Sequence, residues 1–471
     1  MKTAGLSIKG ITSNSKEVKK GFLFVAIKGS RKDGNLYIKE ALAKGASIVV
    51  VEKKLPQIKI PATARWLAVD DCRKFYAQAA HEFYGAPSEK IKVAGITGTN
   101  GKTTISYLIE AMANEAGCAC GVIGTINYRF KGKTIIAKNT TPGAGLLQSL
   151  LKRMCDQKVK YCAMEVSSHA LDQDRAAGID FRQAIFTNLT QDHLDYHKNL
   201  QNYFLAKAKL FSNLAPQAWA IINNDDRYSR RLKRLTPGRV LTYGIENKSD
   251  LMAKQIKFGM QKTEFTLAGP RINMRLKTNL VGRYNIYNIL AACAWGLSEK
   301  IAFGDIRGAI EKFKDVPGRL QRVNTSRGLD IFIDYAHTPD ALFNVISALR
   351  PLVAGKIIVI FGCGGERDKL KRPLMGKVVT ELADFAVITS DNPRSEDPGQ
   401  IIKDIVRRIS KKNYCLVCNR REAIRKGLSL IRKGDCLLIA GKGHEDYQIL
   451  KNKVLKFSDR KVVGECLKLM K

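Results

Sequence analysis

The chain of 471 residues lacks several features that would place it in a specialised class of protein. It has no apolar run approaching the ~18 residues that a membrane-spanning helix needs, so we expect no membrane insertion. It has no internal repeat and no low-complexity tract, and 45% of its residues are hydrophobic, which excludes collagen-like, mucin-like and mostly disordered chains. The first ten residues carry no apolar segment typical of a signal peptide, so we expect a cytoplasmic protein.

Cysteine is too scarce for a disulfide scaffold. The chain has eleven cysteines, an odd number, and several of them lie in apolar segments. Cys415 and Cys418 form a lone CxxC pair whose flanks are typical of a strand, so we expect buried thiols rather than a zinc site. This composition fits a reducing cytoplasm.

Acidic residues are scarce relative to basic ones. The chain has 43 Asp and Glu against 80 Lys and Arg, which gives a formal net charge of +37. Such an excess indicates polyanionic partners, of which nucleic acid is one. The basic residues are spread along the whole chain, however, and nucleic-acid binding needs clustered cations that neutralise several phosphates. We therefore expect no nucleic-acid partner.

Apolar segments bounded by turn residues divide the chain into three α/β blocks, consistent with roughly 100–200 residues per domain. The first block has strand candidates at residues 21–27 and 45–51, and residues 84–89 are typical of a linker. The second block opens with a strand at residues 91–97, and strands and helices then alternate to about residue 315. The third block has parallel-sheet strand candidates at residues 331–334, 356–361, 385–389 and 436–440.

Residues 98–104, with the sequence GTNGKTT, lie between the strand candidate 91–97 and a helix expected from Thr103. A strand, a glycine-rich turn and a helix N-terminus in this order are the context of a phosphate loop. Lys102 would then contact the β- and γ-phosphates, and the Thr103 hydroxyl would bind Mg²⁺. The strict eight-residue pattern fails because position 96 is Ile96 rather than glycine, and a glycine-rich turn without phosphate is the alternative.

Histidine is also scarce, yet five of the six histidines lie in four short polar clusters that each follow an apolar segment. The clusters are residues 167–169, 192–197, 334–337 and 441–445. Polar residues at the ends of several strands can converge on one crevice, so we expect a common site rather than four capped loops. Glu165 and His193 are candidate ligands of a second Mg²⁺, with a hydrogen-bonded surface histidine as the alternative for His193.

Eight stretches make the chain resemble the Mur ligase family over essentially its whole length, and most closely the members that add diaminopimelate. They stand in the order found in the family and are too long for a chance match. The stretches are GTNGKTT at 98–104, NTTP at 139–142, MEVSSHAL at 164–171, TNLTQDHLDYH at 187–197, DYAHTPD at 334–340, FGCGGERD at 361–368, DNPR at 391–394 and GKGHEDYQ at 441–448.

The resemblance implies an α/β fold of three domains. These are an N-terminal UDP-substrate domain at residues 1–89, a central ATP-binding domain with a P-loop ATPase-type parallel sheet at 90–319, and a Rossmann-like amino-acid domain at 320–471. The implied reaction uses ATP and Mg²⁺: ATP phosphorylates the D-Glu γ-carboxylate of UDP-MurNAc-L-Ala-D-Glu, and an amine of meso-diaminopimelate then displaces phosphate. A carboxylate is a poor electrophile and phosphate a good leaving group, so the enzyme supplies positioning and charge neutralisation. We expect a monomer with these small-molecule substrates.

The resemblance also implies residues for the nucleotide and for catalysis. Lys207 matches a lysine that is carbamylated in the family, which turns a cation into a ligand for Mg²⁺, whereas Lys209 would point away on the helix. From the sequence alone both are solvated helix lysines. The implied catalytic residues are Lys102, Glu165, His193 and Lys207, and the implied metal ligands are Thr103, Glu165, His193 and the Lys207 carbamate. The implied ATP-binding residues are Gly98, Thr99, Asn100, Gly101, Lys102, Thr103, Thr104, Asn288, Arg319 and Asp334.

Two further sets are implied for the other substrates. Diaminopimelate carries one carboxylate more than lysine, and an arginine that pairs with it bidentately discriminates strongly. Glu445 would take the distal ammonium, and an ordinary proline turn is the alternative for residues 391–394. The implied diaminopimelate residues are Arg367, Asp391, Asn392, Pro393, Arg394, Gly441 and Glu445. The implied muramoyl-dipeptide residues are Ser15, Asn139, Thr140, Thr141, Ser167, Gln173 and Arg175, of which Arg175 suits a carboxylate or phosphate.

The chain departs from the family pattern at one place, and several other functions are alternatives to a diaminopimelate-adding ligase. Where the family usually has Asp-Ser-Arg near the uridine site, the chain has Asn14, Ser15 and Lys16, so the resemblance does not fix the uridine contacts. A lysine-adding ligase is the nearest rival, and the DNPR stretch argues against it. A folylpolyglutamate synthase would leave the DNPR stretch unexplained. A nucleic-acid-binding ATPase would give the polar clusters of the C-terminal block no function. An inactive binding protein would not need the catalytic and binding residues named above, all of which are present.

Overall fold

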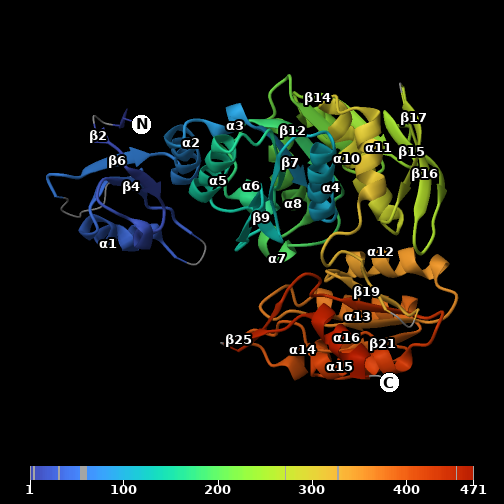
Figure 1. The fold of residues 1–471 in the computed structure, drawn as a ribbon. Coiled ribbons are helices and arrows are strands. Elements are labelled where there is room, and N and C mark those ends of the chain that lie inside the picture. Colours follow the sequence, from blue (N-terminus) through green and yellow to red (C-terminus); the bar gives the residue numbers. More distant parts are fainter. Residues whose placement is uncertain are drawn as a thin grey trace.

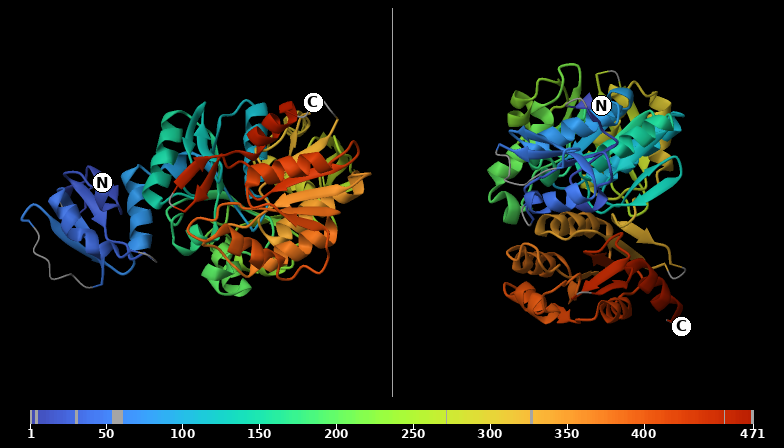
Figure 2. Two further views of the ribbon diagram at one scale, coloured as in Figure 1. Left: turned by 90° about the horizontal axis from the view of Figure 1, so that it is seen from below. Right: turned by 90° about the vertical axis from the view of Figure 1, so that its left-hand side faces the viewer.

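The computed structural model describes residues 2–3, 6–29, 32–53, 61–270, 272–325, 328–451 and 453–469. Three larger sheets follow one another along the chain, and each forms the centre of a separate unit (Figure 1). The N-terminal unit projects from one side of the central unit, and the C-terminal unit lies against another side (Figures 1 and 2). No helix of the described residues is long and apolar enough to cross a bilayer.

The N-terminal unit is a four-stranded parallel sheet with helices α1 (Ile38–Ala43) and α2 (Cys72–Phe83). The expected strands at residues 21–27 and 45–51 are confirmed. The expected linker at residues 84–89 contains the start of a short helix, α3 (Pro87–Lys90), with proline at the first helical position. The Ser88 hydroxyl accepts a hydrogen bond from Asp180 N at 3.0 Å, which fixes α3 to the central unit. The strands are β3 (Gly10–Thr12), β4 (Phe22–Val25), β5 (Ala46–Glu52) and β6 (Arg65–Val69).

The central sheet has eleven strands in the order β10-β9-β8-β11-β7-β12-β13-β14-β15-β16-β17. The seven strands from β8 to β15 in this order pair in parallel, as expected, but antiparallel strands extend both edges. At one edge only Lys131 and Gly132, both with positive φ, join β9 to β10, and so tight a turn permits only antiparallel pairing. The strands are β7 (Lys92–Thr97), β8 (Cys120–Ile123), β9 (Asn127–Phe130), β10 (Lys133–Ile136), β11 (Tyr161–Glu165), β12 (Phe181–Phe186), β13 (Trp219–Asn223), β14 (Arg239–Gly244), β15 (Leu251–Lys257), β16 (Thr263–Gly269) and β17 (Ile272–Thr278).

Helices cover both faces of the central sheet, so alternate residues of its middle strand are buried on opposite sides (Figure 1). On β7, Ala94 and Ile96 pack with helices α4, α10 and α11, whereas Val93 packs with α5 and α8. This double coverage explains why the strand candidates read as continuous apolar runs. The helices are α4 (Lys102–Glu115), α5 (Ala144–Asp156), α6 (Ser168–Asp172), α7 (Leu194–His197), α8 (Leu200–Ser212), α9 (Ser229–Leu235), α10 (Arg283–Ser298) and α11 (Phe303–Lys312).

The C-terminal unit contains a six-stranded sheet in the order β18-β19-β23-β20-β21-β22, in which only β18 is antiparallel. Helices α12 to α14 cover one face and α15 and α16 the other, the Rossmann-like arrangement expected. The strands are β18 (Gln321–Val323), β19 (Asp330–Asp334), β20 (Ile357–Phe361), β21 (Phe385–Ile388), β22 (Tyr414–Leu416), β23 (Cys436–Ala440) and a hairpin of β24 (Tyr447–Leu450) and β25 (Lys453–Lys456). The helices are α12 (Pro339–Leu349), α13 (Lys371–Leu382), α14 (Pro398–Val406), α15 (Arg420–Leu430) and α16 (Asp459–Leu469).

The structure corrects one expectation about cysteine. All eleven cysteines are free, but Cys418 is exposed and Cys415 is half-buried, so the expectation of buried thiols in the CxxC pair is wrong for Cys418. The strand expected there ends at Leu416, which leaves Cys418 in the connection to α15.

A buried ion pair holds the two helices on the outer face of the C-terminal sheet together. The Arg420 guanidinium donates to both Asp459 carboxylate oxygens at 2.8 and 2.7 Å and to Ala440 O at 3.0 Å, and both side chains are fully buried. Because Asp459→Ala leaves a buried cation without its partner, we expect it to lower the free energy of unfolding by about 3–5 kcal/mol. Urea denaturation followed by hydrogen exchange in the C-terminal sheet measures this. The double variant Arg420→Met, Asp459→Leu should recover most of the loss, and a single-variant effect below about 1 kcal/mol would contradict the expectation.

Candidate active site

The predicted phosphate loop joins the C-terminal end of β7 to the N-terminus of α4, in the middle of the central sheet. Gly98 has a φ of +146°, and a Cβ atom there would lie 1.8 Å from the Thr187 hydroxyl, so only glycine fits. A Cβ atom on Gly101 would lie 2.4 Å from the Asn288 side-chain oxygen, which places Asn288 directly beside the loop. The helix begins at Lys102, one residue before the expected Thr103, and Thr104 is buried within it.

Two lysines meet on one carbonyl oxygen of this loop. Lys102 Nζ donates to Gly98 O at 2.9 Å and Thr99 O at 2.8 Å, and Lys207 Nζ, from α8, also donates to Gly98 O at 2.8 Å. Burial lowers the pKa of both amines; the Lys102 ammonium also lowers the pKa of Lys207, and the Arg319 guanidinium lowers that of Lys102. Lys209, by contrast, has a side chain that is 43% exposed and points to Asp174. The two lysines of α8 are therefore distinct in the fold, although the sequence alone gave both as solvated.

Glu165 lies at the end of β11 and connects to the first turn of α4. Its carboxylate accepts hydrogen bonds from Thr125 N at 3.0 Å, the Thr125 hydroxyl at 2.8 Å and the Thr103 hydroxyl at 3.1 Å. Arg319 reaches the same Thr103 oxygen from the connection between the central and C-terminal sheets, and Nη2 donates to it at 3.1 Å. Thr103 thus links a buried carboxylate, an arginine and the phosphate loop.

His193 precedes α7, and its ring stands 4.8 Å from the ring of His169. Burial lowers the pKa of His193 to about 4, with further lowering from His169, Lys207 and Lys102, although Asp192 opposes them. A neutral imidazole has a lone pair available for a metal ion. Within the described ranges, no three His, Cys, Asp or Glu side chains come close enough to hold a metal. A metal site here therefore needs ligands such as Thr103 and a modified Lys207, and the predicted ligand set stays a prediction.

Four of the residues predicted for the muramoyl-dipeptide form a connected network beside Glu165. The Thr141 hydroxyl donates to Glu165 O at 2.8 Å and accepts from Ser167 N at 3.0 Å. Arg175 donates to Thr141 O at 3.1 Å and to the Gln173 side-chain oxygen at 2.6 Å, and burial lowers its pKa. Asn139 and Thr140 lie on the approach to Thr141: Asn139 O accepts from the Tyr128 hydroxyl at 2.6 Å, and the Thr140 hydroxyl lies 3.1 Å from that of Thr125.

Ser15 lies in the N-terminal unit, apart from this network. Its hydroxyl donates to the Glu40 carboxylate at 2.8 Å, and Lys44 pairs with the same carboxylate at 2.7 Å. Asn14 caps the short helix that contains Ser15, since its side-chain oxygen accepts from Lys16 N at 3.1 Å. Asn14 therefore caps this helix, a role that an aspartate fills equally well.

The residues predicted for diaminopimelate gather beyond β21 and β23 of the C-terminal sheet. Asn392 is buried, its amide donates to Glu445 at 2.7 Å, and its oxygen accepts from Ile449 N at 3.0 Å and Lys442 Nζ at 3.2 Å. Lys442 also pairs with Glu445 at 3.1 Å. Burial and the nearby Asp391 raise the pKa of Glu445, and Lys442 opposes them. Gly441 N donates to Asp334 O at 3.1 Å, which ties this cluster to β19.

Arg394 has a rigid backbone and a guanidinium held at one nitrogen. Its φ is +55°, its N–H donates to Ile449 O at 3.1 Å, and Nη1 donates to Gly365 O at 2.6 Å. The Gly365 loop packs closely on Pro393, since a Cβ atom on Gly365 would lie 1.9 Å from Pro393 O. Arg367, on the same loop, is exposed. The two predicted arginines are thus brought to one region, with Arg394 fixed and Arg367 at the surface.

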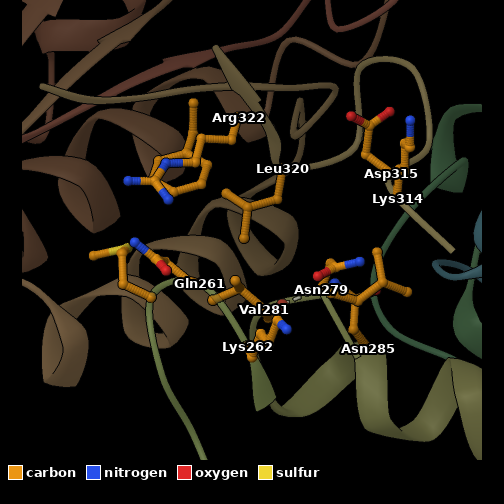
Figure 3. Close-up of a pocket in the computed structure, with 12 residues that line it drawn as sticks. Gln261, Lys262, Asn279, Val281, Asn285, Lys314, Asp315, Leu320 and Arg322 are labelled. Atoms are coloured by element: carbon orange, nitrogen blue, oxygen red, sulfur yellow. Dashed lines mark hydrogen bonds between the residues drawn. The ribbon is translucent and has the colours of Figure 1, made fainter. Parts of the chain in front are cut away.

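The residues predicted to lie on the nucleotide side surround the connection between the central and C-terminal sheets. Buried Asp334 accepts from Leu320 N at 2.5 Å and Ala336 N at 2.6 Å, and burial raises its pKa. Asn288 donates to Asn285 at 3.0 Å, and Asn285 lines a cavity of about 290 Å³ between the two units (Figure 3). The other residues that line it are Met260, Gln261, Lys262, Asn279, Leu280, Val281, Lys314, Asp315, Leu320, Arg322 and Phe332.

Comparison with known proteins identifies the family. Models of the Mur ligase catalytic domain, the Mur ligase middle domain and the Mur ligase glutamate ligase domain match residues 7–84, 96–296 and 318–443. The chain is 44% identical over 463 residues to the UDP-N-acetylmuramoyl-L-alanyl-D-glutamate--2,6-diaminopimelate ligase of Clostridium botulinum, a match that covers 98% of this chain and 95% of the relative. The chain belongs to the Mur ligase family. The enzyme of the same name from Aquifex aeolicus is 45% identical over 461 residues, covering 98% and 94% of the two chains.

Solved structures agree with this Mur ligase fold. A structure of UDP-N-acetylmuramoyl-L-alanyl-D-glutamate--2,6-diaminopimelate ligase is 31% identical, has a TM-score of 0.70 and covers 98% of this chain and 95% of its own. A folylpolyglutamate synthase of Mycobacterium tuberculosis has a TM-score of 0.66 at 17% identity and covers 78% of this chain and 92% of its own, so it shares the fold alone. The predicted family and its three-domain α/β architecture are confirmed.

Several residues of this Mur ligase site make contacts that the sequence did not predict. Lys442 and Asp340 lie inside stretches that carry the family resemblance, yet nothing in their spacing shows that one neutralises Glu445 and the other reaches the phosphate loop. Thr125, which holds Glu165, lies outside those stretches. Arg372 is fully buried and pairs with Glu396 at 2.9 Å, while Glu396 also accepts from Glu366 N in the loop beside Arg394. A buried arginine in a helix is not distinguishable from a surface one by its sequence.

Proposed function

We propose that this Mur ligase uses ATP to join meso-diaminopimelate to UDP-N-acetylmuramoyl-L-alanyl-D-glutamate, a step in the synthesis of peptidoglycan precursors. The observation that carries the proposal is identity of 42–45% over 98% of the chain to several ligases named for this reaction. The arginine and glutamate clusters beyond the C-terminal sheet support it, because diaminopimelate presents carboxylates and ammonium groups together.

The phosphate loop is proposed to bind ATP, with Lys102 leaving its two backbone carbonyls to contact the β- and γ-phosphates. The remaining residues proposed for the nucleotide are Gly98, Thr99, Asn100, Gly101, Thr103, Thr104, Asn288, Arg319 and Asp334. We propose that the nucleotide base extends toward the cavity lined by Asn285, because Asn288 touches the loop and bonds to Asn285 (Figure 3). Arg319, whose Nε is buried without a partner, has donors to spare for a phosphate oxygen.

Magnesium fits the oxygen-rich surroundings of Thr103 and Glu165. Hard divalent cations prefer hydroxyl and carboxylate oxygen, and Mg²⁺ usually takes one or two carboxylates plus substrate phosphates. Lys207 as found is a buried cation beside Lys102, which opposes a metal, whereas a carbamate on Lys207 would supply the missing anion. We propose Thr103, Glu165, His193 and carbamylated Lys207 as ligands. When bound, Mg²⁺ would neutralise charge on the transferred phosphoryl group.

In the proposed reaction, an oxygen of the D-Glu γ-carboxylate attacks the γ-phosphorus of ATP, and the bond from phosphorus to ADP breaks. A neutral amine of diaminopimelate then attacks the acyl carbon, phosphate leaves with the bonding electron pair, and the amine loses a proton to give the amide. Arg175, Gln173, Ser167, Thr141, Thr140 and Asn139 are proposed to hold the muramoyl-dipeptide so that its carboxylate faces the phosphate loop, with Ser15 on the nucleotide end of this substrate. These residues lie next to Glu165, which supports that placement.

For diaminopimelate, we propose that Arg394 and Arg367 pair with the distal carboxylate and that Glu445 pairs with the distal ammonium. Asn392 and Lys442 would position Glu445, and Asp391, Pro393 and Gly441 would shape the pocket. We place the domain boundaries at residues 89/90 and 319/320, and propose a cytoplasmic monomer without a nucleic-acid partner.

The proposal is tested with purified protein, ATP, Mg²⁺ and UDP-MurNAc-L-Ala-D-Glu. We expect phosphate release that depends on meso-diaminopimelate, together with the tripeptide product seen by mass, and much slower release with L-lysine. Equal use of both amino acids would indicate the lysine-adding alternative. Absence of product with either would reject the proposed reaction.

The pH dependence of diaminopimelate binding follows from Glu445. Burial raises its pKa, so Glu445 takes up a proton at a higher pH than a free glutamate and then no longer attracts an ammonium group. We expect the KM for diaminopimelate to rise as pH falls. Lys442→Met removes the cation that stabilises the carboxylate and should move this rise upward by about one pH unit, whereas Glu445→Gln should flatten it. Kinetics across a pH series measure this, with Lys453→Met as the control; a Lys442→Met profile that overlays the wild type would contradict it.

A further inference from the structure

Helix α12 lies on the side of the C-terminal unit that faces the central unit (Figure 1), and a residue of its first turn contacts the phosphate loop. Asp340 lies in this turn, and its Oδ2 atom accepts hydrogen bonds from Asn100 Nδ2 at 2.9 Å and from the Thr190 hydroxyl at 3.0 Å. Both donors belong to the central unit, and Asn100 is a residue of the phosphate loop. One carboxylate oxygen therefore connects two units through residues 240 and 150 positions away in the sequence.

The central side of this contact is rigid. Asn100 N donates to the Asn188 side chain at 3.0 Å, and Asn100 O accepts from the Thr187 hydroxyl at 2.7 Å. Thr190 N in turn donates to the Thr99 hydroxyl at 3.0 Å. The C-terminal side is rigid too, because Thr338 caps α12 and the helix packs into the core of the C-terminal sheet. The hydrogen bonds of Asp340 thus fix one rigid body against another.

The charge of Asp340 does not suit a direct contact with ATP. A carboxylate beside a phosphate loop repels polyphosphate, and burial and Asp192 both raise the pKa of Asp340. The hydrogen bonds from Asn100 and Thr190 offset part of that cost only while the units are docked, whereas the hydrogen bond from Asn344, on α12 itself, does not depend on docking. Asp340 therefore serves the contact between the units rather than the nucleotide.

The docked position matters for the second half of the reaction. The acyl phosphate would form at the phosphate loop, whereas Arg394 and Glu445, proposed for diaminopimelate, belong to the unit that carries Asp340. An amine displaces phosphate efficiently only when its nitrogen is held within attacking distance, and a small misplacement costs up to about 100-fold in rate. We propose that Asp340 is a positioning residue that latches the C-terminal unit onto the phosphate loop, so that the amine rather than water reaches the acyl phosphate. This inference rests on the proposed function.

The variants Asp340→Ala and Thr190→Val each remove one side of the latch without changing a residue assigned to ATP or diaminopimelate. We expect kcat to fall about 10- to 100-fold for Asp340→Ala, with KM values for ATP and diaminopimelate within about twofold of the wild type. The ratio of ADP to tripeptide should rise above one, because water intercepts the acyl phosphate. The radius of gyration in small-angle X-ray scattering should increase, and Asp340→Asn, which keeps one oxygen acceptor, should fall between wild type and Asp340→Ala.

The matched control is Asp305→Ala, which removes a first-turn carboxylate from α11, a helix packed on α4 and β17 of the central unit. It should leave the ratio of ADP to tripeptide and the radius of gyration unchanged. The latch is rejected if Asp340→Ala and Thr190→Val keep one ADP per tripeptide and the wild-type radius, or if Asp340→Ala raises only the KM for ATP. If the wild type forms no tripeptide, the proposed function fails, and the scattering comparison alone still decides the latch. If Asp340→Ala does not fold, Thr190→Val gives the same decision.

Discussion

Replacing Arg394 by lysine is expected to lower kcat/KM for meso-diaminopimelate by about 100- to 1,000-fold, while the weak use of L-lysine changes by less than about tenfold. The two amino acids differ by one carboxylate. A planar guanidinium pairs with that carboxylate through two parallel hydrogen bonds, which a lysine ammonium cannot reproduce. Kinetics with both amino acids as competing substrates measure the change in preference.

The backbone at Arg394 makes this a clean test. Arginine and lysine suffer the same steric penalty at a φ of +55°, and the N–H that donates to Ile449 O is unchanged. The loss therefore reflects the side chain rather than the loop. Arg408→Lys, an exposed position in the same unit, is the control and should leave the preference unchanged. Equal losses with diaminopimelate and lysine would contradict the role given to Arg394.

Replacing Lys207 by methionine is expected to lower kcat by about 1,000-fold or more without destabilising the protein. Without modification, Lys207 is a buried amine beside Lys102 that donates to one carbonyl oxygen, and burial and the Lys102 charge hold its pKa well below the ordinary value. A neutral buried amine reacts readily with carbon dioxide, and the resulting carbamate would hold Mg²⁺ and relieve the repulsion from Lys102. Methionine has a similar shape and no charge, so it removes the ligand but not the packing.

Lys209→Met is the matched control for this variant. Lys209 lies two residues further along the same helix, and its side chain is 43% exposed. Its replacement by methionine should change neither kcat nor the melting temperature. Lys207→Met should melt at the wild-type temperature or above. Removing carbon dioxide and bicarbonate should also lower wild-type activity, and adding bicarbonate should restore it. Wild-type activity in Lys207→Met would contradict the proposed ligand.

Local features of the fold could be predicted from the sequence because their signals are local. Within residues 91–104, an apolar run predicts a strand, the glycines predict a turn, and the residues after them predict the start of a helix. The observed bounds of β7 and the start of α4 differ from these predictions by one residue. The apolar runs of the C-terminal unit became buried parallel strands for the same reason. The family resemblance then ordered these elements into three domains, which the residues alone divided only into blocks.

Features that depend on distant segments could not be predicted in this way. The packing of Ser88 against Asp180 and the exposure of Cys418 both arise from how distant elements meet. Lys207 and Lys209 differ only because one faces the phosphate loop and the other Asp174. Asp340 contacts a residue 240 positions earlier, and no periodicity in the sequence records such a contact.

The measurement that most directly tests the central claim follows oxygen through the reaction. UDP-MurNAc-L-Ala-D-Glu is prepared with ¹⁸O in the D-Glu γ-carboxylate and incubated with the wild type, ATP, Mg²⁺ and meso-diaminopimelate. Transfer through an acyl phosphate predicts one ¹⁸O atom in each phosphate released, with one tripeptide formed per phosphate. Phosphate free of ¹⁸O, or label appearing in AMP, would contradict the account.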